Sequence, residues 1–198
     1  MKKFELTSEF VTFLGKKLFR IKALVEFGNV EAGELGGYIE KEENLSQSGN
    51  AWVYDNAKVY GDARVCGDAK VYGDAKVYDN AVVYGDAEVY GDAEVCGDAR
   101  VYGDAKVYGD ARVCGDADYA YAHGFGSCFR TTTFFRLKDG GIGVRCGCFY
   151  GTLQEFRYKV QETHKNTKKA REYLMLADLM ELRFSKEKTG DENSKGNN

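Results

Sequence analysis

The sequence predicts a mainly β protein: a solenoid of very short strands, with a β cap before it and a small α+β domain after it. A six-residue phrase, A-x-V-Y-G-D, is repeated about twelve times between Gly49 and Asp118. In such a solenoid each repeat buries its apolar face only against its neighbours. Proline is absent from all 198 residues, which suits strands whose backbone N–H groups are all needed in ladders.

Alternation within the phrase predicts which side chains lie inside. Alanine recurs at every sixth residue from Ala51 to Ala117, and valine follows two places later from Val53 to Val113. Residues i and i+2 of a strand point to the same side, so Ala and Val form a thin interior and the intervening residue and Tyr point outward. Gly-Asp or Asp-Asn supplies each corner, because Gly tolerates positive φ and Asp can hydrogen-bond its own local backbone.

This repeat resembles the hexapeptide-repeat proteins that form left-handed parallel β-helices. The resemblance implies three hexads per coil, so that residues 18 apart stack about 4.8 Å above one another, and it implies a homotrimer packed side by side. With the lead-in G-N-A-W-V-Y at 49–54, residues 18–120 are similar to uncharacterised hexapeptide-repeat proteins of bacteria and their phages, some of which carry an acyltransferase label. The resemblance therefore points to a protein encoded by a phage or a mobile element.

The N-terminal residues 1–30 predict a β-hairpin cap. In the run F-R-I-K-A the alternation places Phe19, Ile21 and Ala23 on one buried face, with the basic residues between them in water. This start lacks the apolar run of a signal peptide, and the sequence has no segment of 18 apolar residues, so we expect a cytoplasmic protein that does not bind membranes.

The solenoid is expected over residues 31–122, beginning before its phrase becomes regular. Ile39 and Leu45 lie six residues apart and in line with Ala51, which predicts that they occupy the alanine row of the first coil. Their larger side chains suit a coil whose end must be closed.

Residues 123–184 predict a small domain with a β-hairpin and two helices, and the polar residues 185–198 are expected to be disordered. The expected elements are strands at 131–137 and 142–149 and helices that begin near Thr152 and Thr167. The sequence T-L-Q-E at 152–155 is a capping box. The second helix is apolar over a wide stripe, enough to cover a sheet and also contact a neighbouring subunit.

The outward tyrosines form columns when every eighteenth residue is taken. One column is entirely tyrosine: Tyr54, Tyr72, Tyr90 and Tyr108. We predict that this amphipathic stripe is an oligomer interface. A second column contains Tyr60, Tyr78, Cys96 and Cys114, and a third contains Cys66, Tyr84 and Tyr102. Cys96 and Cys114 would lie on adjacent coils, where a cytoplasmic protein is expected to keep them as free thiols.

Charge separates the solenoid from the C-terminal domain. Residues 49–118 contain 14 acidic and 7 basic residues, whereas residues 119–184 contain 6 acidic and 11 basic ones. We predict that basic side chains of this domain contact a protein partner: Arg130, Arg136, Arg145, Lys168 and Lys169. The acidic solenoid makes direct binding of nucleic acid unexpected. The aspartates at its corners instead leave open that the solenoid mimics nucleic-acid phosphates and occupies a DNA-binding protein.

Residues for catalysis are sparse. The hexapeptide acyltransferases use a histidine general base near the coil, but the two histidines here, His123 and His164, both follow the repeat. Cys128, Cys146 and Cys148 together with His123 have the residue types of a zinc site, but their spacing matches no common structural motif. We therefore expect no catalytic, cofactor or metal site, and leave open whether these four residues bind a metal.

The sequence thus favours a non-catalytic binding and assembly protein. Its solenoid would oligomerise, and its C-terminal domain would engage a protein partner, for example a host-defence protein that it inhibits. An acyl-CoA-dependent acyltransferase with its cleft between subunits is the alternative from another class, and the acidic nucleic-acid mimic is a third.

Overall fold

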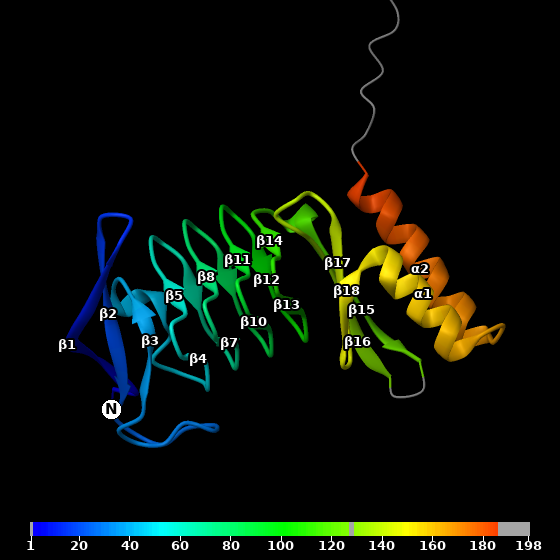
Figure 1. The fold of residues 1–198 in the computed structure, drawn as a ribbon. Helices are drawn as coiled ribbons and strands as arrows, with labels where there is room; N and C mark the ends of the chain where they lie inside the picture. The colour runs from blue at the N-terminus through cyan, green and yellow to red at the C-terminus, as the bar shows by residue number, and fades with distance from the viewer. Residues whose placement is uncertain (1, 127–128, 186–198) are drawn as a thin grey trace, which may run out of the picture.

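The predicted fold class is confirmed by a computed structural model, which describes residues 2–126 and 129–185. The chain forms a left-handed parallel β-helix of about four coils. An N-terminal hairpin closes one end of the β-helix, and a small antiparallel sheet with two helices lies at the other end (Figure 1). Cys128 and residues 186–198 of the predicted tail lie outside the described residues.

Very short strands carry the coils. They are β4 (Trp52–Val53), β5 (Lys58–Val59), β6 (Arg64–Val65), β7 (Lys70–Val71), β8 (Lys76–Val77), β9 (Val82–Val83), β10 (Glu88–Tyr90), β11 (Glu94–Val95), β12 (Arg100–Val101), β13 (Lys106–Tyr108) and β14 (Arg112–Val113). They stack into three parallel faces. Face 1 contains β3, β5, β8, β11 and β14, face 2 contains β4, β7, β10 and β13, and face 3 contains β6, β9 and β12.

The 18-residue register is confirmed on all three faces. Val59 pairs with Val77, and Val77 with Val95 on face 1, while Val83 pairs with Val101 on face 3. Every alanine from Ala51 to Ala111 and every valine from Val53 to Val113 at the inward positions of the phrase is fully buried. The backbone N–H groups donate to the following coil, which explains why proline is excluded.

The corners are held between coils rather than within one. Gly67 has a φ of +70°, and a Cβ added there would lie 2.9 Å from the backbone nitrogen of Gly85 on the next coil. At an Asp-Asn corner, Asp55 adopts the same left-handed region, with φ of 51°. Its carboxylate accepts a hydrogen bond from the N–H of Gly73, at 3.1 Å. The expected bond from aspartate to its own local backbone is therefore wrong for this corner, because the carboxylate reaches the next coil.

The N-terminal hairpin extends face 1. Strands β1 (Phe4–Phe13) and β2 (Lys16–Ala23) pair antiparallel, β2 pairs with β3 (Leu35–Ile39), and β3 pairs in parallel with β5. Because β1 and β2 continue the sheet, they cover the edge that the first coil would otherwise expose.

The buried face of the hairpin differs in part from the prediction. Ile21 and Ala23 are buried as expected, but Phe19 is only half-buried and Leu18 is buried in its place. The pairing of β2 with β3 is irregular beyond Arg20. Such an irregularity moves the neighbouring side chains to the other face, so one strict alternation cannot hold along the strand.

The first coil is longer than the others, so its predicted register is wrong. Ile39 pairs with Val59, and Leu45 with Val65, each 20 positions along rather than 18. The two residues therefore stack on the valine row instead of the alanine row. A short 3₁₀ turn, Glu42–Asn44, lies between them within the ordinary six-residue spacing. The two additional residues fall between Leu45 and Trp52, which pairs with Lys70, 18 positions along.

Polar and aromatic side chains close this end of the prism. The fully buried Asn44 side chain donates to the carbonyl oxygens of Gly61 and Ala63, at 3.1 and 2.8 Å. Trp52 occupies the outward row of face 2 as predicted, but it is fully buried. The hairpin and the loop after it cover Trp52 with the rings of Phe4 and Phe27, whose centroids lie 6.2 and 5.3 Å from the indole.

At the other end, an antiparallel sheet seals the solenoid. Its strands are β15 (Tyr119–Phe125), β16 (Arg130–Arg136), β17 (Ile142–Cys146) and β18 (Phe149–Thr152). The predicted hairpin is confirmed as β16 and β17, whereas β15 and β18 were not expected. β15 crosses the domain boundary expected at 122/123. Phe135 joins the Ala and Val core of the coils, and the Lys106 N–H donates to the hydroxyl of Thr133 at 3.0 Å.

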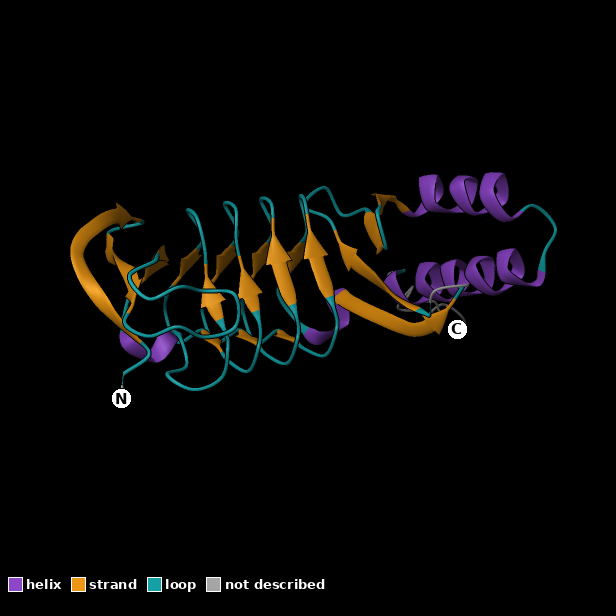
Figure 2. Ribbon diagram, turned by 90° about the horizontal axis from the view of Figure 1, so that it is seen from below, coloured by secondary structure: helices purple, strands orange, loops and turns teal. Residues whose placement is uncertain are grey.

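Two helices cover the outer side of this sheet, α1 (Leu153–His164) and α2 (Lys168–Phe184), as Figure 2 shows. The predicted capping box is confirmed: Thr152 Oγ1 accepts from the Glu155 N–H at 3.2 Å, and the Glu155 carboxylate accepts from the Thr152 N–H at 2.7 Å. Three side chains of α2 stay exposed on its outer side: Met175 (70%), Leu179 (54%) and Leu182 (72%). Within the described residues, no helix combines the length and apolarity needed to cross a membrane.

The buried valine row gives a direct test of the inward assignment. Val77→Asp should destabilise the fold by more than about 3 kcal/mol or prevent soluble expression, because an unpaired carboxylate would enter a fully buried row. Lys76→Ala, one residue earlier on the outward row, should cost less than about 1 kcal/mol. Urea unfolding followed by circular dichroism measures both. Equal tolerance of the two substitutions would contradict the assignment.

Candidate interaction surfaces

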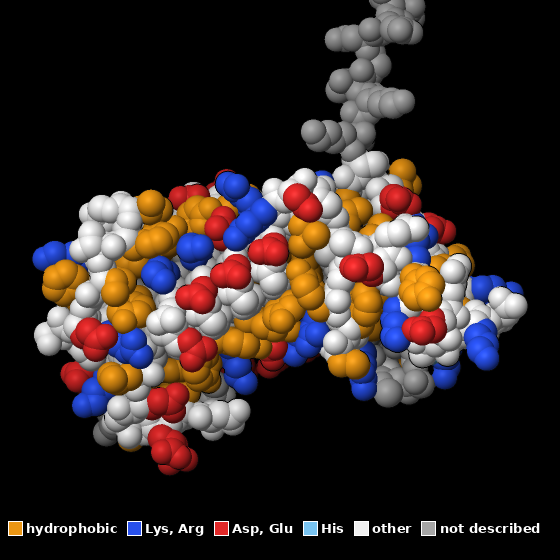
Figure 3. Space-filling model, viewed as in Figure 1, with side chains coloured by type: hydrophobic (Ala, Val, Ile, Leu, Met, Phe, Trp, Pro, Cys, Tyr) orange, Lys and Arg blue, Asp and Glu red, His pale blue; other side chains and the backbone are white. Residues whose placement is uncertain are grey.

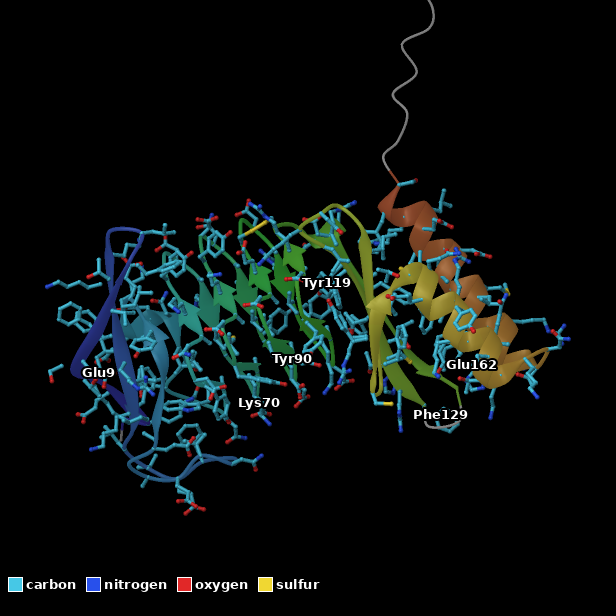
Figure 4. All side chains as sticks on the ribbon, viewed as in Figure 1. Glu9, Lys70, Tyr90, Tyr119, Phe129 and Glu162 are labelled. Carbon is cyan, nitrogen blue, oxygen red and sulfur yellow. A yellow bond between two sulfur atoms is a disulfide. The ribbon has the colours of Figure 1, made fainter. Side chains whose placement is uncertain are left out.

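The first tyrosine column lies on face 2, and its rings are in contact from coil to coil as the spacing predicts, although only Tyr72 and Tyr90 are stacked in parallel. Consecutive ring centroids of Tyr54, Tyr72, Tyr90 and Tyr108 are 6.3, 4.8 and 4.3 Å apart. The rings are half-buried, and the C-terminal domain covers the last two. The Arg145 guanidinium lies 5.4 Å from the centroid of Tyr108, and the ring of Tyr150 meets Tyr108 edge-on at 4.5 Å. Figure 4 shows the labelled Tyr90 on the solenoid.

Burial changes the acidity of this column. The pKa values of Tyr54, Tyr72 and Tyr90 are raised, chiefly because burial disfavours the tyrosinate. Nearby acidic groups raise the pKa values of Tyr54 and Tyr72 further, whereas Arg145 opposes the shift at Tyr90. For Tyr72 the acidic neighbour is Glu88, whose carboxylate also accepts a hydrogen bond from the phenol at 3.0 Å. These tyrosines therefore stabilise the fold only while they are protonated.

The second column, on face 1, is covered at its N-terminal end. Tyr60 stacks on Tyr78 with centroids 5.1 Å apart and is buried beneath the hairpin. At the other end the structure joins Cys96 and Cys114 in a disulfide, so the expectation of free thiols is wrong here. The physical reason is the register itself, which sets the two Cα atoms 4.3 Å apart on adjacent coils.

The third tyrosine column, on face 3, remains partly exposed. Tyr84 and Tyr102 stack with centroids 5.3 Å apart and are 38% and 41% exposed. Beside them runs a second outward row, in which Val82 separates Arg64 from Arg100. Both arginines are exposed, and neither guanidinium has an ion-pair partner among the described residues.

The equivalent rows of the other faces are paired within the chain. On face 1, Lys76 lies 3.5 Å from Glu94, and on face 2, Lys106 lies 2.8 Å from Glu88. Face 3 was not singled out from the sequence, although a signal was present. Its row lacks the alternating acidic residue that the other two rows contain.

Exposed aspartates border the faces at the corners of the coils: Asp62, Asp68, Asp74, Asp86, Asp92, Asp98, Asp104 and Asp110. Figure 3 shows a row of acidic side chains along the solenoid beside a band of hydrophobic ones. Some corner carboxylates serve the fold: Asp62 pairs with Lys41 at 2.7 Å, and Asp68 accepts from the N–H of Asn50 at 3.1 Å. The corner charge therefore has a structural role at these positions.

The five basic residues predicted to bind a partner are not gathered in one place. Arg136 pairs with Asp118 at 3.2 Å and donates to the Phe184 carbonyl at 3.1 Å, and Arg145 lies against the first tyrosine column. Both therefore hold the C-terminal domain together or join it to the solenoid. Arg130, Lys168 and Lys169 are exposed. Binding of a partner by these residues stays a prediction.

Neither histidine belongs to a coil, but His123 lies beside the last one. Nδ1 of His123 is 2.9 Å from the Thr131 hydroxyl and 3.9 Å from the Asp104 carboxylate, and both members of this His–Asp pair are more than half exposed. His164, at the end of α1, stacks on Tyr173 with centroids 5.8 Å apart. Among the described residues, no three potential ligands lie close enough together to hold a metal ion.

Comparison with known proteins gives one short similarity. A 38-residue segment is 47% identical to an "Uncharacterized acetyltransferase YdcK" of Escherichia coli (strain K12). The segment covers 19% of this chain and only 12% of that protein. No protein-family profile matches the chain. This similarity agrees with a hexapeptide-repeat solenoid and is too short to carry an activity across.

The raised pKa values of the first column predict loss of stability in alkali. An unfolded tyrosine releases its proton near pH 10, while the folded column retains its protons to higher pH. Stability is therefore complete below about pH 10 and falls as pH rises beyond it. Parallel titration by tyrosinate absorbance and circular dichroism should show a late ionisation step that coincides with unfolding.

Tyr72→Phe should move this alkaline transition to higher pH, since it removes a proton that the folded state must retain. Tyr158→Phe, which changes a 69% exposed ring on α1, is the matched control. Complete ionisation of all 14 tyrosines near pH 10 with unchanged circular dichroism would contradict the burial of the column.

Proposed function

We propose that this chain is a non-catalytic binding and assembly protein, whose β-helix associates with other copies and whose C-terminal domain binds a protein partner. The observation that carries the proposal is face 3. An exposed stack of Tyr84 and Tyr102 lies there beside two exposed arginines without ion-pair partners among the described residues, on a solenoid whose other faces are covered or paired. Tyrosine and arginine are the residue types most enriched where protein interfaces derive their affinity.

A second copy supplies the complementary charge. Exposed aspartates such as Asp68, Asp86 and Asp104 recur once per coil along a corner, and Arg64 and Arg100 lie two coils apart on face 3, so every second aspartate has the spacing of the arginines. A neighbour packed side by side would therefore place a row of carboxylates against the two arginines. Repeated rows favour closed, symmetric assembly of identical rods, and a homotrimer is the expected form.

The first tyrosine column remains a second candidate for the contact between copies. Tyr54 and Tyr72 are half-buried at its N-terminal end, whereas the C-terminal domain already covers Tyr90 and Tyr108. Less ring surface is therefore free on face 2 than on face 3. This difference supports face 3 as the main contact in our proposal.

The C-terminal domain supplies a surface that does not repeat, as recognition of one partner requires. Lys168 and Lys169 are exposed at the start of α2, Arg130 is exposed on β16, and Met175 is an exposed apolar residue on α2. Exposed positive charge on this domain fits an acidic protein surface. A host-defence protein, inhibited by a factor that a phage or mobile element encodes, is the specific partner we propose.

A second candidate function rests on a separate observation. His123 and Asp104 form a histidine–carboxylate pair at 3.9 Å beside the last coil, and the Thr131 hydroxyl holds Nδ1 of His123 at 2.9 Å, so an oriented ring is available as a general base. Together with the similarity to a segment of an uncharacterised acetyltransferase, this pair favours an acyltransferase as the alternative. Both side chains are more than half exposed, so in one chain no walls exclude water from the pair.

The proposed division between solenoid and C-terminal domain predicts two opposite losses in the full-length chain. Tyr84→Ser with Tyr102→Ser should weaken self-association by about tenfold or more while partner binding persists, because two interface rings are removed. Lys168→Glu with Lys169→Glu should leave the oligomer intact and abolish capture of the partner. Sedimentation velocity and quantitative pull-down from the native host measure the two properties on the same samples.

Each double variant is the matched control for the other. Dissociation caused by Tyr54→Ser with Tyr72→Ser, but not by the face 3 variant, would assign the contact to face 2. Sedimentation of the unchanged chain as a monomer would overturn the assembly proposal. Loss of both properties in one variant would contradict the division of roles.

The acyltransferase alternative predicts binding of acetyl-CoA and acyl transfer, whereas our proposal predicts neither. We expect no heat of binding for acetyl-CoA in calorimetry and no acyl transfer to small-molecule acceptors. His123→Ala, an exposed substitution, should leave fold, assembly and partner binding unchanged. Acyl transfer by the unchanged chain that His123→Ala abolishes and His164→Ala does not would establish the alternative.

A further inference from the structure

A cavity of about 310 Å³ lies in the C-terminal domain, between the β15–β18 sheet and helices α1 and α2. Its walls are mainly apolar and aromatic: Phe125, Phe149, Phe156, Val160 and Tyr173. Phe156 holds the walls together, with its ring 5.6 Å from that of Phe149 and 5.7 Å from that of Tyr173. Because Phe156 is buried and fixed by both neighbours, the apolar part of the cavity is preformed.

The ionisable groups at the rim of this cavity are basic, apart from two thiols. Arg130, Lys159 and His164 line it, and no carboxylate is among the described lining residues. Glu162 pairs with Lys159 at 2.7 Å but does not line the cavity; Figure 4 labels it on α1. Arg130 has no ion-pair partner among the described residues, so its charge is available to a ligand.

A glycine turn places Arg130 at the rim. Gly147 joins β17 to β18 with φ of +59°, and a Cβ added there would collide with the Arg130 guanidinium. The guanidinium therefore lies over the turn, between the lining residues Cys146 and Cys148. Only glycine gives both this backbone conformation and this space.

We propose that this cavity binds a small organic anion, with an aromatic or aliphatic body in the apolar part and a carboxylate, sulfonate or phosphate at Arg130 and Lys159. Apolar walls with a few placed polar groups are typical of small-molecule sites, and the volume suits a small ligand. Guanidinium binds such oxyanions through paired hydrogen bonds. The site does not involve face 3 and is therefore independent of self-association. Arg130 also belongs to the proposed partner surface, but binding of a small probe tests the cavity in the absence of any partner.

A matched pair of probes tests the charge requirement: anilinonaphthalene sulfonate and phenylnaphthylamine, which has the same rings without the sulfonate. In calorimetry on the full-length chain, the sulfonate should bind one site per chain and about tenfold more tightly than the amine. Arg130→Gln and Lys159→Gln should each weaken sulfonate binding about tenfold and leave binding of the amine unchanged. Lys169→Gln, on α2 outside the cavity, is the matched control.

The alkylation rate of Cys148 reports whether the probe is bound in the cavity. This exposed cysteine lines the cavity, so occupancy should slow its alkylation by iodoacetamide, measured by peptide mass spectrometry, while Cys66 on the solenoid reacts at an unchanged rate. Equal affinity for the two probes, unchanged sulfonate binding in Arg130→Gln, or unprotected Cys148 at saturation would each overturn the proposal. The last outcome would assign the probe to the exposed apolar side of α2.

Discussion

The stacking of one coil on the next is the constraint on which the rest of this structure depends. Each strand has only two or three residues, so no coil is stable alone, and its N–H groups must donate to the following coil. That requirement fixes an 18-residue register, an Ala and Val interior too thin for a charge, and corners whose glycines nearly touch the next coil. It also leaves a first and a last coil with open ladders, which the hairpin and the C-terminal sheet cover.

The sequence was most informative where this constraint repeats. The period alone predicted the buried alanine and valine rows from Ala51 to Val113, and local signals gave the β16–β17 hairpin and the capping box at Thr152. Prediction failed where the repeat meets its caps. The first coil gains two residues between Leu45 and Trp52, and a pairing irregularity exchanges Leu18 for Phe19. Both features arise from tertiary packing, which periodicity cannot report.

The candidate surfaces were predictable to a similar extent. The spacing predicted the columns, but exposure depends on what the hairpin and the C-terminal domain cover, so the all-tyrosine column proved to be the more buried one and the Tyr84–Tyr102 stack the more open one. Composition alone could not distinguish Arg136 and Arg145, which contact other residues of the chain, from the exposed Arg130. Their partners, Asp118 and the ring of Tyr108, are close only in the folded chain. The disulfide of Cys96 and Cys114 follows from the register, which brings the two residues together on adjacent coils. The expectation of free thiols had been drawn from the predicted cytoplasmic location instead.

The outward rows also show what the solenoid does not need for its own stability. Pairs such as Lys76–Glu94 and Lys106–Glu88 add a few tenths of a kcal/mol each and help to set the register. On face 3, Arg64, Val82 and Arg100 offer no such gain, and the tyrosines beside them leave about two fifths of each side chain in water. A repeat that could have placed glutamate there, as it does on both other faces, instead keeps a basic and aromatic strip. We propose that this strip serves a contact beyond the single chain, in which the acidic corners of another copy would provide the charge that it lacks.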